Sequence, residues 1–216
     1  VPTEIDTIAG GATMLSHALP SAGVVYTNVL FDLKNLPPSE VSLLPLFTRL
    51  MLEAGTSKLD ATTLQRRIGA RTGGISVSTS VEQPVGPGGA VSGPYDVAHH
   101  LVISGKATNE KLPELVELMQ DVISDTKLDS QDKVLELLRE TKSRMESSFI
   151  SAGNRYAGSR LASRNTLEGY INEITGGVSY YSTVKALLKD AADDWPSLLA
   201  RLEKLRTTLL ARAGPA

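Results

Sequence analysis

The chain has 216 residues, 41% hydrophobic and 21% charged, a composition typical of a soluble globular protein long enough to bury a core. Its formal net charge of −2 argues against a nucleic-acid-binding module, because phosphate contacts require clustered Lys and Arg. The absence of cysteine excludes disulfides, thiolate zinc sites and a cysteine nucleophile.

No apolar run reaches the roughly 18 residues that a membrane-spanning helix needs, so we expect no membrane contact. Val1–Gly11 carries no positive charge ahead of an apolar stretch, and it therefore does not resemble a signal peptide. Because the sequence lacks an initiator Met, we expect a processed product or an excised piece of a longer protein.

The first predicted elements are two strands, Thr13–Leu19 and Val24–Leu33. The second has the strongest strand signal in the chain, because β-branched and aromatic residues are frequent in it. A helix is predicted over Glu40–Ala54, where leucines and other apolar residues recur at helical spacing. Two prolines prevent an earlier start, so Ser39 is the predicted N-cap, and Gly55 is predicted to end the helix.

A second helix is predicted over Leu59–Ala70, with Asp60 as its N-cap. Gly74–Val81 alternates between apolar and polar residues, which predicts a half-buried strand, and His99–Gly105 returns beside it as a hairpin. The connection Gln83–Pro94 contains four glycines and three prolines, and we expect a mobile surface loop there.

Helical patterns dominate the rest of the chain, with breaks expected at Gly176-Gly177 and at Trp195-Pro196. Strands followed by helices, without βαβ alternation, predict an α+β fold in which an antiparallel or mixed sheet packs on helices. We expect one domain over residues 1–216. The predicted helices are Lys111–Asp125, Ser130–Ser151 with further helix toward Leu167, and Ser182–Leu210.

The three histidines do not predict a metal site. His99 and His100 are adjacent in a predicted strand, so their side chains point to opposite faces and cannot hold one ion together. We expect one of them to face the core and the other to face solvent. The third, His17, has no histidine neighbour in the sequence.

Carboxylates that might act as acids or bases lie on helices of mixed charge, and we interpret them as a solvated face. For the first two we expect partners in Arg139 and Arg144. These carboxylates are Glu136, Glu140, Asp193, Asp194 and Glu203.

No other catalytic or phosphate-binding motif is present. The chain has neither a G-x-S-x-G elbow nor a G-x-x-x-x-G-K-[ST] loop, and Gly86-Pro87-Gly88-Gly89 does not lead into a helix. The helical arginines Arg155, Arg160 and Arg164 are interpreted as a solvated stripe rather than a ligand clamp. The residues alone thus predict a domain without a recognisable active site.

Ser42–Thr56, which follows a strand ending in Phe31-Asp32-Leu33, resembles the first helix of a pitrilysin-type (inverzincin) peptidase domain. In active members this helix carries H-x-x-E-H, in which two histidines bind zinc and the glutamate activates water. Alignment on Gly55-Thr56 implies a degenerate motif, because leucine cannot bind zinc and arginine cannot serve as a base. The positions are occupied by Leu46, Arg49 and Leu50.

A second stretch, Glu173–Tyr181, contains Gly-Gly-Val-Ser-Tyr and is followed by Asp193-Asp194-Trp195. It is similar to the C-terminal half of plant-type presequence proteases, and the resemblance extends over about Ile5 to Leu210. It implies the third of four homologous domains in a zinc metalloendopeptidase that degrades targeting presequences and other short unstructured peptides inside a closed chamber.

The resemblance further implies that this chain holds no catalytic residue and no cofactor, since zinc belongs to the first domain of the parent enzyme. Its partners would be the other domains and the enclosed peptides, with neither nucleic acid nor membrane. The expected location is the mitochondrial matrix, the chloroplast stroma or both. Two alternatives stay open: a free-standing inactive scaffold subunit of an organellar complex, and an unrelated enzyme that uses scattered carboxylates.

Overall fold

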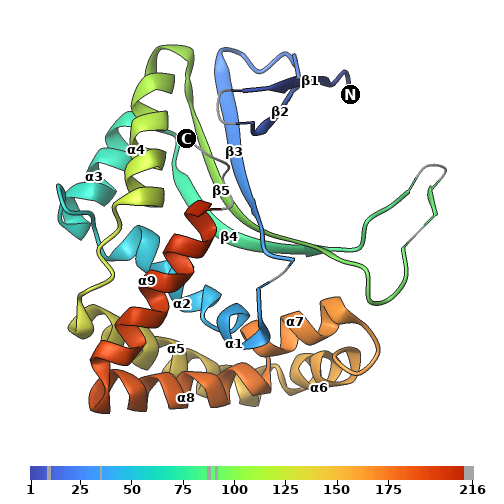
Figure 1. Cartoon of the computed structure of the whole chain (residues 1–216), viewed down its shortest axis with the longest axis vertical. Coiled ribbons are helices and arrows are strands. Elements are labelled where there is room, and N and C mark those ends of the chain that lie inside the picture. Colours follow the sequence, from blue (N-terminus) through green and yellow to red (C-terminus); the bar gives the residue numbers. More distant parts are fainter. Residues whose placement is uncertain (9–10, 35, 87–88, 91, 212–216) are drawn as a thin grey trace.

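The main sheet has three antiparallel strands, and helices cover one of its faces (Figure 1). The computed structural model describes residues 1–8, 11–34, 36–86, 89–90 and 92–211. The strands are β3 (Val24–Asp32), β4 (Ile75–Glu82) and β5 (Ala98–Thr108), in the order β3-β5-β4. The α+β fold and all three predicted strands are therefore confirmed, and β5 extends three residues beyond its predicted end.

Strand β5 occupies the centre of this sheet. On one side Asp32 pairs with His100, and on the other Glu82 pairs with Ala98. Residues of β5 alternate in burial, so that Leu101 and Ile103 face the helices. The opposite face of the sheet is open to solvent, as antiparallel sheets allow.

The N-terminal strands form a separate two-stranded ribbon, which lies at the top of the molecule in Figure 1. It consists of β1 (Glu4–Thr7) and β2 (Thr13–Ser16), paired antiparallel. The prediction of a strand over Thr13–Leu19 is thus correct in kind but three residues too long, and β1 was not predicted. Side chains of both strands are mostly exposed, so no alternating apolar pattern identifies them.

The predicted single helix Glu40–Ala54 is wrong, because the chain forms two helices there: α1 (Pro38–Val41) and α2 (Leu44–Glu53). Pro45 explains the break, since it has no N–H to donate and its ring would clash with the preceding turn of a continuous helix. The N-cap of α1 is Pro37 rather than Ser39, and Pro38 suits the first helical position.

Gly55 follows the C-cap of α2 by one residue, with a φ of 80°. This left-handed conformation favours glycine, and a Cβ would lie 2.6 Å from the carbonyl oxygen of Leu59. The predicted glycine stop is therefore correct in function, although Ala54 is the cap itself.

The remaining helices confirm the predicted pattern to within two residues at most ends. Asp60 and Ser130 cap α3 and α5 as predicted, through hydrogen bonds from backbone N–H groups. Breaks occur at Gly177 and Asp194, as expected. The helices are α3 (Ala61–Arg71), α4 (Leu112–Ser124), α5 (Gln131–Ser151), α6 (Gly153–Ala162), α7 (Leu167–Gly176), α8 (Val178–Asp193) and α9 (Trp195–Ala211).

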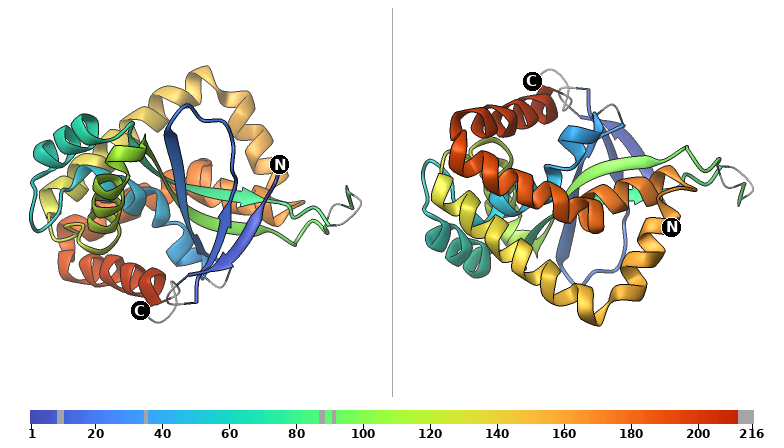
Figure 2. Two further views of the ribbon diagram at one scale, coloured as in Figure 1. Left: turned by 90° about the horizontal axis from the view of Figure 1, so that it is seen from above. Right: turned by 90° about the horizontal axis from the view of Figure 1, so that it is seen from below.

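Buried apolar side chains from the sheet and the helices form one connected cluster. Helices α5 and α8 run side by side beneath the sheet, with α7 packed on α8 (Figure 2). No helix in the described part of the chain is long and apolar enough to cross a membrane. Three residues of the Gln83–Pro94 loop (87, 88 and 91) lie outside the described residues, so its mobility stays a prediction.

Candidate functional site

The candidate site is the helix α2, which carries the three residues singled out by the sequence. Leu46 and Leu50 lie one turn apart and are 2% and 0% exposed. The helix packs against β4 and α5, so both leucines belong to the core between the sheet and the lower helices. Their predicted burial on the face toward the sheet is confirmed.

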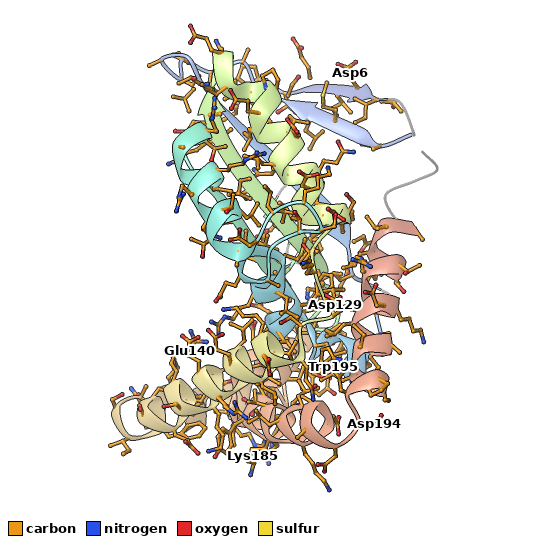
Figure 3. The ribbon with its side chains drawn as sticks, turned by 90° about the vertical axis from the view of Figure 1, so that its left-hand side faces the viewer. Asp6, Asp129, Glu140, Lys185, Asp194 and Trp195 are labelled. Atoms are coloured by element: carbon orange, nitrogen blue, oxygen red, sulfur yellow. The ribbon has the colours of Figure 1, made fainter. Side chains whose placement is uncertain are left out.

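Arg49 lies at the edge of that buried face and binds two carboxylates. Its Nε donates to Glu53 at 2.9 Å, and its Nη2 donates to Glu140 of α5 at 2.6 Å (Glu140 is labelled in Figure 3). Its Nη1 lies 3.2 Å from the hydroxyl of Thr141 and 3.3 Å from the carbonyl oxygen of Leu137. The guanidinium therefore joins α2 to α5, and the predicted acidic partner is found.

The charges around Arg49 stabilise one another. Burial acts to lower the pKa of Arg49, but hydrogen bonds to Glu53 and Glu140 outweigh burial and raise it. The same hydrogen bond lowers the pKa of Glu140 below its ordinary value. A permanently charged guanidinium cannot accept a proton, so this position offers no general base.

The partners predicted for the α5 carboxylates, Arg139 and Arg144, are wrong. Glu140 pairs with Arg49, and Glu136 accepts from Lys133 at 3.0 Å. The i,i+4 rule describes neighbours on one helix, and it does not account for an arginine that reaches over from another helix.

The other candidate carboxylates have structural roles or face solvent. Asp194 caps α9, accepting from the backbone N–H of Ser197 at 3.3 Å, and Figure 3 shows it beside Trp195 where α8 meets α9. Glu203 pairs with Arg206 one turn away, and Asp193 is exposed. None of these side chains comes together with α2 to form a catalytic pair.

The structure contains a buried carboxylate that the sequence did not predict, Glu173 of α7, which is 2% exposed. It accepts hydrogen bonds from the hydroxyl of Ser159 at 2.7 Å, from Arg160 at 3.2 Å and from the backbone N–H of Ser179 at 3.0 Å. Burial acts to raise the pKa of Glu173, but these hydrogen bonds together lower it.

This buried carboxylate explains the Gly-Gly-Val-Ser-Tyr segment. A Cβ at Gly177 would overlap the carboxylate of Glu173, so only glycine fits between α7 and the N-terminus of α8. Ser179 supplies the backbone N–H, at the positive end of the α8 dipole. A glutamate one turn before a Gly-Gly break was the only sequence signal for this site.

The arginine stripe is likewise only partly solvated, which corrects the prediction. Arg160 pairs with Glu173 and donates to the hydroxyl of Ser179 at 2.7 Å. Arg155 lies over the ring of Tyr156, with its Cζ 5.1 Å from the ring centroid. Arg164 is exposed.

His99 and His100 lie on opposite faces of β5, as predicted, with His99 buried and His100 half-buried. Burial lowers the pKa of the His99 imidazole, and the neighbouring His100 lowers it further. His17 lies elsewhere, 3.2 Å from the carbonyl oxygen of Pro2. Within the described ranges, no group of three His, Asp or Glu side chains is arranged to hold a metal ion.

Known proteins resemble this chain over nearly its whole length. A sequence model of the family described as peptidase M16, subfamily C, associated matches residues 1–187. Presequence protease 1, chloroplastic/mitochondrial, of Arabidopsis thaliana is 30% identical over 99% of this chain and 19% of its own length. The mitochondrial presequence protease of Candida albicans is 29% identical over 83% of this chain and 17% of its own length.

The chain thus spans about a fifth of the length of these curated relatives. Among solved structures, a peptidase M16 inactive domain from Pseudomonas fluorescens aligns with a TM-score of 0.55 and 14% identity. That alignment covers 100% of this chain and 52% of the other, and it shows a shared fold.

Proposed function

The chain belongs to the family associated with subfamily C of the M16 peptidases, and from this membership we propose that it is a non-catalytic domain of a larger organellar zinc metalloendopeptidase. Membership confirms the family resemblance that the sequence motifs predict. The small share of each relative that the chain covers supports its being one domain among several. Peptide hydrolysis would then belong to the longer protein.

The observation that carries this proposal is the environment of α2. We infer that Leu46, Arg49 and Leu50 occupy the positions of the lost zinc motif. Both leucines are buried, and each adds on the order of 1.5–3 kcal/mol of transfer free energy in place of a polar ligand. Arg49 is fully engaged with Glu53 and Glu140. These side chains support a packing role for the helix and offer zinc no ligand.

The open face of the sheet suits a wall of the proposed peptide chamber. Tyr26 and Leu30 of β3 are 68% and 55% exposed there, although they are large and apolar enough to contact an unstructured peptide. The names of the relatives support presequences as substrates, and the mitochondrial matrix or the chloroplast stroma as the location. The other domains of the same peptidase would be its partners.

The proposal is tested by comparing the 216-residue chain with the protein encoded by its native reading frame. Each is assayed with a fluorogenic presequence peptide, and each is analysed for bound zinc. We expect chelator-sensitive hydrolysis and stoichiometric zinc only in the longer protein. Hydrolysis by the chain alone would contradict the proposal, and a native frame without H-x-x-E-H would favour a free-standing scaffold subunit.

A further inference from the structure

A polar cavity of about 290 Å³ lies where α2, α5, α6 and α8 meet. Three guanidinium groups and two phenol rings contribute to its lining, and among the described residues no carboxylate does. We call this cavity the arginine pocket. Its charged and aromatic lining residues are Arg49, Arg144, Arg155, Tyr156 and Tyr180.

Two of these side chains lack partners among the residues that the structure describes. Tyr180 is only 5% exposed, yet in the described part of the chain its hydroxyl forms no hydrogen bond. The side chain of Arg144 forms neither a hydrogen bond nor an ion pair with any described residue. Buried polar groups are normally satisfied, so a phenol and a guanidinium left open to one cavity indicate a bound ligand or solvent.

Every uncommitted group in the pocket is a hydrogen-bond donor. Burial, the largest effect, raises the pKa of Tyr180 to about 12, although the charges of Arg144 and Arg49 act to lower it. The phenol therefore keeps its proton at neutral pH and can donate it. Arg155 lies 3.4 Å from the hydroxyl of Tyr156, which also meets Ser148, so these groups form a second polar wall.

The charge of the pocket fits a monoanion. Arg49, Arg144 and Arg155 contribute three positive charges, while Glu53 and Glu140, both bound to Arg49, contribute two negative charges. One positive charge remains. A carboxylate neutralises it and accepts from a guanidinium and a hydroxyl at once, whereas a phosphate dianion would leave negative charge in a partly buried cavity.

We propose that the arginine pocket binds a carboxylate, held by Arg144 and the hydroxyl of Tyr180. Such a group occurs at the C-terminus of a peptide and on Asp and Glu side chains. The pocket belongs to this chain whatever the longer protein does, and its ligand binding is measured without a peptidase assay.

The test is an NMR titration of the purified chain at low ionic strength with N-acetyl-Ala-Ala and with its C-terminal amide. We expect saturable shifts of Arg144 and Tyr180 signals with the acid only. Arg144→Gln should weaken binding about tenfold or more, and Tyr180→Phe severalfold. Arg139→Gln on the exposed side of the same helix is the matched control and should leave binding unchanged.

Tyr180→Phe removes a hydroxyl that has no partner among the described residues, so this variant should fold like the parent, which a denaturant melt verifies. Equal binding of acid and amide, or an equal loss in Arg139→Gln, would overturn the proposal. Tighter binding of inorganic phosphate would overturn the choice of carboxylate. N-acetylglutamate α-amide tests the side-chain source, and binding of either acid supports the site.

Discussion

Nη2 of Arg49 lies 2.6 Å from Oε2 of Glu140, and this ion pair joins two helices that are distant in the sequence. The same guanidinium also binds Glu53 of its own helix. A residue at the proposed position of a lost catalytic base has thus become a structural contact between α2 and α5.

This ion pair should make stability depend on pH. The pKa of Glu140 is lowered in the folded chain, so its stabilising effect is complete above the ordinary carboxyl pKa and is lost as pH falls through the folded pKa. Arg49→Met removes the cause of the shift and should flatten the acid limb. Urea melts from about pH 7 to about pH 3, which bracket the ordinary carboxyl pKa, measure this. An unchanged acid limb would argue against the pair.

Deleting the side chain of Leu50 should destabilise the fold strongly. Leu50→Ala leaves a cavity in the core and should cost about 2–5 kcal/mol in the free energy of unfolding. Leu52→Ala, on the same helix but only partly buried, is the matched control and should cost less, as should Arg49→Ala. Denaturant melts give the three values. A neutral Leu50→Ala would mean that the register assigned to the zinc motif is wrong.

Restoring the motif should harm the chain rather than activate it. Leu46→His, Arg49→Glu and Leu50→His together place two imidazoles in an apolar core without partners for their second nitrogens. We expect a less stable protein without peptidase activity, followed by melts and a fluorogenic peptide assay. Chelator-sensitive hydrolysis in this triple variant would contradict the expectation.

The two adjacent glycines should respond differently to alanine. Gly177→Ala forces a Cβ against the carboxylate of Glu173 and should cost about 1–3 kcal/mol. Gly176→Ala meets nothing within 4 Å and lies at the end of α7, so it should be neutral or slightly stabilising. Thermal melts of both variants compare them directly. Equal losses would show that the carboxylate is not what limits this position.

Glu173 should contribute stability that acid removes. Glu173→Gln replaces an oxygen that accepts hydrogen bonds with an amide that cannot, and should cost about 1–3 kcal/mol at neutral pH. Because the folded pKa of Glu173 is lowered, the parent should lose this advantage as pH falls below about 4.3, whereas the variant has none to lose. Urea melts at neutral pH and at about pH 3 test this, with Glu168→Gln on the same helix as the control.

Local patterns predicted the strands because Val24–Leu33 and Gly74–Val81 carry their own periodicity. The same approach failed at α1 and α2, where helical spacing continues through Pro45 although the backbone cannot. Strand β1 was missed because its side chains are exposed and carry no burial pattern.

The candidate site was predicted in its burial but not in its contacts. Leu46 and Leu50 follow from helical periodicity, while the choice of Glu140 by Arg49 depends on how α2 and α5 pack. The network at Glu173 depends on three helices meeting, which no spacing rule expresses.

The central position of β5 also determines when the sheet can assemble. During synthesis β3 and β4 leave the ribosome first, yet each pairs only with β5 within the described chain, so neither has a partner until the chain has reached Thr108. Val24 must then find Thr108 across a long loop, which makes this pairing slow compared with helix formation. Until that moment two strand edges stand open, so the nascent chain is most prone to aggregate before β5 emerges.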